Sequence, residues 1–307
     1  MTSESSTATR PSRRYTVAGA EIEAPPLALG LHVVATPIGN LRDVTLRALE
    51  VLAAADVIAC EDTRITRRLL DHYGIATPLT PYHEHNAADV RPKILARLAA
   101  GERVALVSDA GTPLISDPGF KLLREASEAG HAVTAIPGAS SVLAALSVAA
   151  LPTDRFFFEG FLPPKQTARQ KRIAELARIP ATLVLFETGP RMAAALADLA
   201  DGLGPRTAAI CRELTKLHEE VRRDELPKLA RHYAGDAETR GEFVLVIAPP
   251  PDEEPGSIDI DAMLRAALAR TSVKDAVGEV TMATGLSRRE VYQRALELAK
   301  EAGDGVP

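Results

Sequence analysis

The chain has 307 residues, of which 25% are charged and 46% are hydrophobic, and its formal net charge is −5 at pH 7. This length is enough for two domains with buried cores. No apolar run approaches the roughly 20 residues that span a bilayer, so we expect no membrane partner. Because the net charge is negative, any nucleic acid would have to bind to a local basic surface.

The N-terminal segment and the cysteines indicate a cytoplasmic protein. Residues 1–30 are rich in Ser, Thr, Arg and Pro and show little apolar periodicity, which predicts a mostly disordered leader. No apolar run follows the basic N-terminus, so the segment does not read as a secretion signal. Cys60 and Cys211 lie in apolar stretches, which is typical of buried thiols in a reducing compartment.

Residues 31–137 are predicted to form an α/β domain, because short aliphatic runs alternate with amphipathic stretches. The predicted strands are 31–35, 57–60, 104–107 and 132–136, and the predicted helices are 45–54, 63–73, 86–99 and 118–129. The strands are continuous apolar runs, as expected for a parallel sheet that is covered on both faces.

Residues 138–250 are predicted to form a second α/β domain, in which strand directions could be mixed. Its predicted strands are 156–161, 182–186, 208–212 and 243–247, and its predicted helices are 165–178, 191–203 and 225–233. Prolines and acidic residues predict a linker at 251–256. Beyond it, 257–303 predicts a small appendage of three helices, with Ser257 and Ser287 as N-cap candidates and Glu290 completing a capping box with Ser287.

Four loops follow predicted strands, at the edge where open α/β sheets bind ligands. They are Thr36–Leu41 (TPIGNL), Glu61–Arg64 (EDTR), Ser108–Pro113 (SDAGTP) and Pro137–Ser141 (PGASS). Glycine-rich dinucleotide and phosphate-loop motifs are absent from the sequence, and so is a nucleophile elbow. His83 and His85 could ligate a metal, but no second ligand pair accompanies them, so we predict no metal site.

These motifs carry a resemblance that extends from about Leu31 to Ala248. Together with Asp154–Phe156 (DRF), Glu159–Pro163 (EGFLP), Arg212–Lys216 (RELTK) and Gly241–Glu242, the loops resemble those of the bacterial 16S ribosomal RNA ribose 2′-O-methyltransferases. That family modifies a decoding-centre cytidine and is a branch of the tetrapyrrole methylase superfamily.

The resemblance implies a two-domain α/β fold with S-adenosylmethionine (SAM) in a cleft between the domains. It also implies 16S rRNA in the 30S subunit as the substrate and a homodimer as the assembly. The implied cofactor-binding residues are Pro37, Gly39, Asp109, Ala110, Gly111, Thr112, Gly138, Ala139, Ser140, Phe161, Phe186, Glu187, Arg212, Glu213, Gly241 and Glu242. Small residues among them suit a cofactor that approaches the backbone. Glu187 could instead cap the helix that begins near Pro190.

A ribose hydroxyl is a weak acid, so methylation would be assisted by a positioned base. The candidates are Glu61, Asp62, His83 and Asp109. We favour the Glu61–Arg64 loop, in which Arg64 would hold a phosphate and a carboxylate of Glu61 or Asp62 would face the 2′-hydroxyl. In the alternative, Asp62 caps the helix that starts at Thr63 and a carboxylate of this loop pairs with Arg64.

Basic helices suggest where RNA would bind. Lys165, Arg169, Lys171, Arg172 and Arg178 fall in one predicted helix, which is either an RNA-binding surface or an ordinary solvated face. Residues 273–292 resemble a helix-turn-helix, with Arg288, Arg289 and Arg294 on its second helix, although packing-only helical hairpins share this pattern. The alternative functions are methylation of a tetrapyrrole and non-catalytic nucleic-acid binding.

Overall fold

A computed structural model describes residues 13–115, 119–235, 237–251 and 260–303 of the chain. Contacts divide the chain into two compact units, Met1–Pro249 and Pro250–Pro307. Most of the predicted linker lies outside the described residues. Within the described residues, no helix has both the length and the apolar composition that crossing a bilayer requires.

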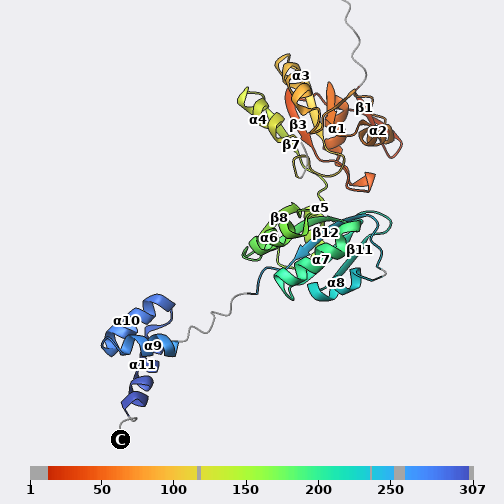
Figure 1. The fold of residues 1–307 in the computed structure, drawn as a ribbon. Helices are drawn as coiled ribbons and strands as arrows, with labels where there is room; N and C mark the ends of the chain where they lie inside the picture. The colour runs from red at the N-terminus through yellow and green to blue at the C-terminus, as the bar shows by residue number, and fades with distance from the viewer. Residues whose placement is uncertain (1–12, 116–118, 236, 252–259, 304–307) are drawn as a thin grey trace, which may run out of the picture. The chain divides into compact units, whose positions relative to one another are not determined.

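The first unit contains a five-stranded sheet that is parallel throughout, and it includes the four strands that were predicted. Its strands lie in the order β5 (Leu79–Pro81), β4 (Val57–Cys60), β6 (Arg103–Val107), β3 (Gly30–Val34) and β7 (Val133–Ile136). α1 (Leu46–Ala54) and α2 (Thr63–His72) pack on one face, and α3 (Ala87–Ala99) and α4 (Phe120–Glu128) pack on the other (Figure 1). A short 3-10 helix, η1 (Leu41–Asp43), follows the first loop. The short edge strand β5 was not predicted.

The predicted disordered leader is wrong from Arg14 onward. β1 (Arg14–Val17) and β2 (Ala20–Glu23) form an antiparallel hairpin whose turn, Ala18 and Gly19, has positive φ at both residues. Tyr15 is only 3% exposed and belongs to the core beneath α1. Burial of this aromatic ring stabilises the hairpin. The apolar periodicity of the segment is too weak to predict this contact.

The second sheet of this unit is mixed, which confirms that strand directions vary. Its order is β11 (Glu220–Glu225), β10 (Thr207–Arg212), β12 (Glu242–Ile247), β9 (Thr182–Thr188) and β8 (Phe156–Phe161). Only β8 and β9 pair in parallel. The charged edge strand β11 was not predicted, because its residues face solvent and lack an apolar alternation.

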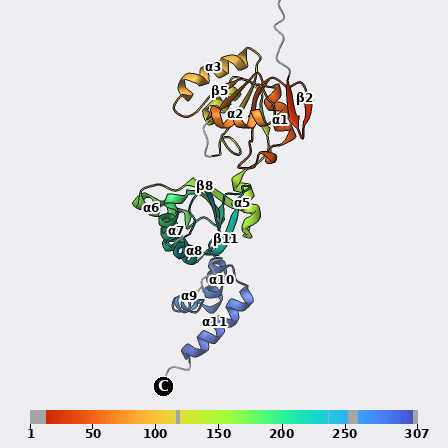
Figure 2. The same ribbon diagram turned by 90° about the vertical axis from the view of Figure 1, so that its right-hand side faces the viewer.

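Helices cover both faces of this second sheet (Figure 2). α6 (Gln166–Leu176), α7 (Gly189–Leu203) and α8 (Leu226–Tyr233) share a core with one face. α5 (Ser141–Ala149), which was not predicted, packs on the other face together with Ile38 from the first loop. A side chain of the first loop therefore belongs to the same hydrophobic cluster as α5 and the second sheet.

The second unit contains the three helices that were predicted: α9 (Ile260–Leu268), α10 (Val273–Thr284) and α11 (Arg288–Gly303). They enclose a small core of their own, made of Leu264, Val277, Val280, Val291, Ala295 and Leu298. Gly285, with φ +70°, ends α10, and Ser287 Oγ accepts a hydrogen bond from Glu290 N at 3.3 Å. Ser257 lies outside the described residues.

Candidate active site

The four loops meet at one edge of the first sheet, because they follow β4, β6, β3 and β7, which are consecutive neighbours in it. Thr36 and Gly111 exchange backbone hydrogen bonds of 2.9 and 3.0 Å. Asp62 N donates to Asp109 Oδ1 at 2.9 Å, and Thr112 Oγ1 donates to the Ala139 carbonyl at 3.2 Å. Hydrogen bonds thus connect loops that are distant in sequence.

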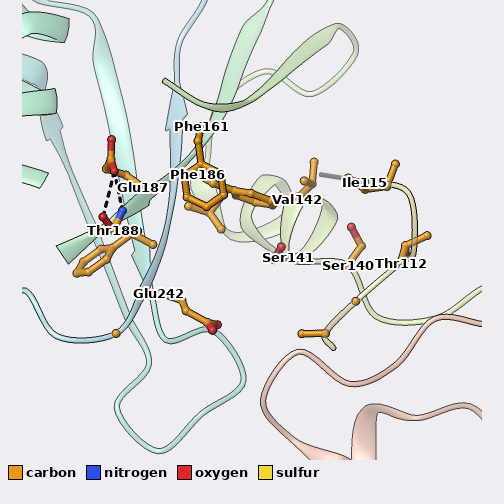
Figure 3. Close-up of a pocket in the computed structure, with 15 residues that line it drawn as sticks. Thr112, Ile115, Ser140, Ser141, Val142, Phe161, Phe186, Glu187, Thr188 and Glu242 are labelled. Atoms are coloured by element: carbon orange, nitrogen blue, oxygen red, sulfur yellow. Dashed lines mark hydrogen bonds between the residues drawn. The ribbon is translucent and has the colours of Figure 1, made fainter. Parts of the chain in front are cut away.

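A first cavity of about 260 Å³ lies between these loops and the second sheet (Figure 3). Phe161 and Phe186, whose ring centroids are 5.6 Å apart, line one side, and Thr112 and Ile115 lie opposite. The remaining lining residues are Ala110, Gly111, Ser140, Ser141, Val142, Glu187, Thr188, Gly241, Glu242, Phe243 and Val244. A mostly apolar cavity with a few polar groups is typical of a small-molecule site.

Glu187 places a buried carboxylate at the wall of the first cavity. Its Oε1 accepts a hydrogen bond from Thr188 N at 2.7 Å (Figure 3). The same oxygen lies 3.2 Å from Arg191 Nε. The N-cap of α7 is Thr188 and not Glu187, so the capping alternative is not confirmed. Glu187 Oε2 is buried and has no partner among the described residues. An unpaired buried acceptor is unfavourable, so a ligand with a hydrogen-bond donor would fit here.

A second cavity of about 450 Å³ adjoins the first, and Ala110 and Glu242 line both. The other residues around it are Thr36, Pro37, Ile38, Gly39, Leu41, Ile65, Thr66, Arg68, Leu69, Ser108, Asp109 and Lys216. Lys216 lies in the loop between β10 and β11, with its Nζ 2.8 Å from Glu213 Oε1 and 3.0 Å from Glu242 Oε2. Its stem leaves no room for a Cβ on Gly39, which would lie 2.4 Å from Lys216 Cγ.

Asp62 caps α2 and pairs with Arg64, which is the alternative to the catalytic role predicted for this loop. Asp62 Oδ1 accepts from Arg64 N at 2.8 Å at the start of α2, and Arg64 Nη2 donates to Asp62 Oδ2 at 2.6 Å. The hydrogen bonds from Arg64 lower the pKa of Asp62 to about 2. A carboxylate held so firmly in its charged form is a weak base, which argues against Asp62 as the catalytic base. The Arg64 side chain, predicted to hold a phosphate, is exposed and pairs with Asp62.

Glu61 and Asp109 have the opposite electrostatic character. Burial raises the pKa of Glu61, and the nearby charge of Asp109 raises it further. Burial also raises the pKa of Asp109, against the lowering effect of the hydrogen bond from Asp62 N. Of these two residues, Asp109 lines the second cavity, and Glu61 lines neither the first nor the second. A carboxyl whose pKa is raised by its surroundings and that faces a cavity is a candidate for acid–base chemistry.

Most, but not all, of the residues predicted to bind the cofactor line one of the two cavities. Pro37, Gly39 and Asp109 line only the second cavity. Gly138, Ala139, Arg212 and Glu213 line neither, although Glu213 Oε1 accepts from Glu242 N at 2.9 Å and so positions the cavity wall. Sequence reasoning missed Ile115, Ser141, Val142, Lys216 and Arg68. Arg68 could have been found, because it lies one helical turn after Arg64.

The basic helix α6 differs from the predicted RNA-binding surface. Arg169 is buried, and its Nε donates to Asp198 Oδ2 at 2.6 Å, so it is removed from the proposed RNA contacts. Arg172 is held by both oxygens of Glu159 at 2.6 and 2.7 Å and is also occupied. Lys165 and Lys171 are exposed.

In the second unit, the predicted arginines separate into two groups. Arg288 and Arg289 are exposed at the start of α11. Arg294, by contrast, donates from Nε to Asp261 Oδ1 of α9 at 2.7 Å. Arg294 therefore joins two helices, whereas the side chains of Arg288 and Arg289 have no ion pair or hydrogen bond within the described residues.

The sequence predicts that the two cysteines are buried thiols and that His83 and His85 form no metal site. Cys60 and Cys211 are free and buried. The rings of His83 and His85 lie 6.0 Å apart. Across the part of the chain that the structure describes, no three His, Cys, Asp or Glu side chains gather as a metal site.

Comparison with known proteins identifies the family. The sequence profile of the tetrapyrrole (corrin/porphyrin) methylases matches residues 30–230, and that of the RsmI C-terminal HTH domain matches residues 254–299. This chain belongs to the tetrapyrrole methylase family. It is 49% identical over 286 residues to a ribosomal RNA small subunit methyltransferase I from Mesorhizobium japonicum, covering 93% of this chain and 97% of that protein. A protein of the same name from Pseudomonas aeruginosa is 44% identical, covering 87% and 96%.

Solved structures of tetrapyrrole methylases and related enzymes share the fold. A uroporphyrin-III C-methyltransferase from Thermus thermophilus in complex with S-adenosyl homocysteine has a TM-score of 0.50 and 20% identity, covering 71% of this chain and 97% of that one. A diphthine synthase has a TM-score of 0.56 and 19% identity, covering 71% and 89%. The tetrapyrrole methylase described here is thus a methyltransferase whose methyl donor is SAM.

The side chains that line the first cavity fit the chemical groups of SAM. The unpartnered Glu187 Oε2 needs a donor, and SAM carries hydroxyl and amino groups. Phe161 and Phe186 offer faces to a flat ring or a sulfonium, since aromatic faces attract cations. Ser140 at the start of α5 adds backbone N–H groups beside this cavity of the tetrapyrrole methylase.

Proposed function

We propose that this methyltransferase transfers the methyl group of SAM to the ribose 2′-oxygen of a cytidine in 16S rRNA, within the small ribosomal subunit. The observation that carries the proposal is the near full-length match to proteins named ribosomal RNA small subunit methyltransferase I. The resemblance of the loop motifs supports the 2′-oxygen as the acceptor atom. The place of action would be the cytoplasm, where ribosomal subunits are found.

The geometry of the two cavities is compatible with this reaction. SAM supplies a methyl group that its sulfonium already activates. The chain's own residues must then align the acceptor hydroxyl and take its proton. We assign Phe161, Phe186 and Glu187 to holding SAM in the first cavity, which leaves the adjoining second cavity for the acceptor.

Among the basic residues predicted to contact RNA, we propose that those with exposed and unpaired side chains bind it. These are Lys165 at the N-cap of α6, Lys171 on α6, Arg178 just after α6, and Arg288 and Arg289 on α11. Contacts between such side chains and phosphates supply affinity that does not depend on sequence and that falls with salt. We propose that the C-terminal unit adds affinity for the subunit and that the chemistry belongs to the first unit.

A homodimer is the assembly that we propose, and the edge of the first sheet supports it. β7 is an edge strand of a parallel sheet, yet Val133, Thr134 and Ala135 are exposed, and Phe120 on the adjoining α4 is 67% exposed. An exposed apolar edge is a liability unless another chain covers it. Light scattering should give a dimer mass for the wild type and a lower mass for Phe120→Asp. A wild-type monomer at high concentration would contradict the proposal.

The decisive experiment offers labelled SAM with three acceptors: 30S subunits, free 16S RNA and uroporphyrinogen. We expect label in the RNA of 30S subunits. Alkaline hydrolysis then identifies the atom, because cleavage of RNA needs a free 2′-hydroxyl, so a 2′-O-methylated nucleotide leaves an uncut dinucleotide. Label released as a mononucleotide would indicate base methylation. Label in the tetrapyrrole alone would favour the tetrapyrrole alternative, and no transfer to any acceptor would favour the non-catalytic one.

A further inference from the structure

We propose that the second cavity receives the ribose to be methylated, that Asp109 accepts the proton of its 2′-hydroxyl, and that Arg68 holds a neighbouring phosphate. This inference rests on the proposed function and deepens it, since it assigns the acceptor side of the site. The residues are Asp109 after β6 and Arg68 on α2, and both line the second cavity.

The second cavity lies where an acceptor would have to be. It adjoins the first cavity at Ala110, the residue directly after Asp109, and at Glu242. A methyl group that leaves the first cavity across this boundary therefore enters the space that Asp109 faces. In-line transfer requires donor and acceptor to be held next to each other in this way.

Asp109 is the carboxylate that fits the role of base. Its Oδ1 is fixed by the N–H of Asp62 at 2.9 Å, while its Oδ2 has no hydrogen-bond partner among the described residues. Asp62 is excluded because Arg64 and the start of α2 occupy both of its oxygens. Glu61 is excluded because it lines neither cavity.

The surroundings of Asp109 raise its pKa above the usual range of a carboxyl. Burial raises its pKa, the N–H of Asp62 lowers it, the Asp62 carboxylate raises it, and Arg64 lowers it. Glu61 and Cys60 also interact with Asp109. A raised pKa makes the carboxylate a stronger proton acceptor once it is ionised.

Arg68 offers a cation at the mouth of the same cavity. It is exposed on α2, and no ion pair or hydrogen bond of its side chain occurs within the described residues. Ile65 and Leu41, which are 42% and 36% exposed, flank it with apolar surface that could pack against a sugar or base. A free guanidinium beside an apolar wall suits a nucleotide, whose phosphate is charged and whose ring is not.

The reaction balances with these groups. A lone pair of O2′ forms the bond to the methyl carbon while the bond between that carbon and sulfur breaks. The electron pair of the broken bond stays on sulfur, which becomes a neutral thioether. The 2′ proton passes to Asp109 Oδ2 and is then released to water, so no additional reactant is needed.

The test of the base is Asp109→Asn, which keeps an oxygen to accept the Asp62 N–H and should therefore fold. We expect kcat on 30S subunits to fall by about 10² to 10⁴. The wild-type kcat should rise about tenfold per pH unit below the pKa of the base and then level, whereas the variant should lose this slope. SAM affinity measured by calorimetry should not change.

Glu61→Gln provides the discriminating comparison. If it removes the pH slope while Asp109→Asn retains wild-type kcat, the base is Glu61 and the inference is overturned. Failure of the wild-type protein to methylate 30S subunits would instead contradict the proposed function. The two failures are therefore distinguishable in one set of assays.

The test of the phosphate contact is Arg68→Gln, with Lys93→Gln on α3 as the matched control. Both residues are exposed cations of the first unit, but Lys93 lines neither cavity. Arg68→Gln should raise the half-saturating concentration of 30S subunits and reduce the salt slope by about one. SAM affinity should be unchanged. Equal salt slopes for the two variants would overturn the role of Arg68.

Discussion

Gly111 lines the first cavity, and three features of its backbone and surroundings favour glycine at this position. Its φ is +81°, its N–H and carbonyl both pair with Thr36, and an added Cβ would lie 3.3 Å from Ile38 Cγ2. A left-handed backbone costs an L-residue about 1–2 kcal/mol. Strain and crowding therefore act at the same residue.

We expect Gly111→Ala to destabilise the first unit by about 1–2 kcal/mol and to weaken SAM binding as well. Gly101→Ala is the matched control, because Gly101 has φ +78° and nothing within 4 Å of an added Cβ. Urea unfolding should show a similar loss of stability for both variants. Calorimetry should show weaker SAM binding only for Gly111→Ala, and equal affinities would place SAM away from this wall.

The ion pair of Arg169 and Asp198 is structural, since both side chains are almost fully buried and 2.6 Å apart. Removing one partner leaves an uncompensated buried charge, which costs about 3–5 kcal/mol. Arg169→Ala should therefore lower the free energy of unfolding by this amount. Lys171→Ala, on the exposed side of the same helix, should leave stability within about 0.5 kcal/mol. Similar stabilities for the two variants would refute the structural role.

The same pair predicts how stability responds to acid. Burial would raise the pKa of Asp198, but hydrogen bonds from Gln170, Arg169 and Gln166 outweigh it and lower the pKa in the folded state. The stabilisation is therefore present above the unfolded pKa and is lost as the pH falls through the folded one. Urea midpoints between neutral pH and pH 3 should decline less steeply for Asp198→Asn than for the wild type. Parallel curves would contradict this sign.

At the scale of elements, the N-terminal hairpin acts as part of the first core rather than as a leader. Thr16 N donates to the Tyr73 carbonyl at 2.7 Å, and Arg13 pairs with Asp56 at 2.9 Å. Tyr15 buries its ring between these anchors. The hairpin thus closes the end of the layer formed by α1 and α2.

We expect Tyr15→Ala to destabilise the first unit by about 3 kcal/mol, because a large buried ring is lost and a cavity remains. Ile22→Ala is the control on the partner strand, since Ile22 is 37% exposed and should change stability by well under 1 kcal/mol. Thermal unfolding followed by circular dichroism measures both. A small effect of Tyr15→Ala would mean that the hairpin is dispensable.

At the scale of the whole molecule, we propose that the first unit carries out methyl transfer and that the second unit adds affinity for the ribosomal subunit. The second unit has its own core, which predicts that removing it leaves the first unit folded. Tethering a second binding surface raises affinity without adding chemistry. The contribution of the C-terminal helices should therefore appear in binding of the subunit and not in the reaction itself.

Deleting residues 250–307 should preserve SAM affinity and the melting temperature of the first unit. The half-saturating concentration of 30S subunits should rise about tenfold or more. The full-length double variant Arg288→Gln, Arg289→Gln should show part of the same increase. Identical titration curves for the truncated and full-length proteins would show that the unit does not bind RNA, and loss of SAM binding would show that it completes the first cavity.

The sequence by itself determined the layers of this protein and the edge at which its loops meet. Strands such as Val57–Cys60 are continuous apolar runs, and the amphipathic stretches between them have a helical period, so both follow from local patterns. The strand-following loops had to gather at the carboxyl edge of a parallel sheet, because connections in such a sheet leave little choice. The sequence motifs of these loops also indicated the family to which the chain belongs.

Only the tertiary structure decided which charged groups remain free to act. Asp62 and Asp109 are both loop carboxylates in the sequence, yet folding pairs Asp62 with Arg64, whereas Asp109 lines a cavity and its Oδ2 has no hydrogen-bond partner within the described residues. Arg169 and Arg68 are both helical cations, yet one is buried against Asp198 and the other is exposed. The physical reason is that burial and pairing depend on residues distant in the chain, which no local pattern reports.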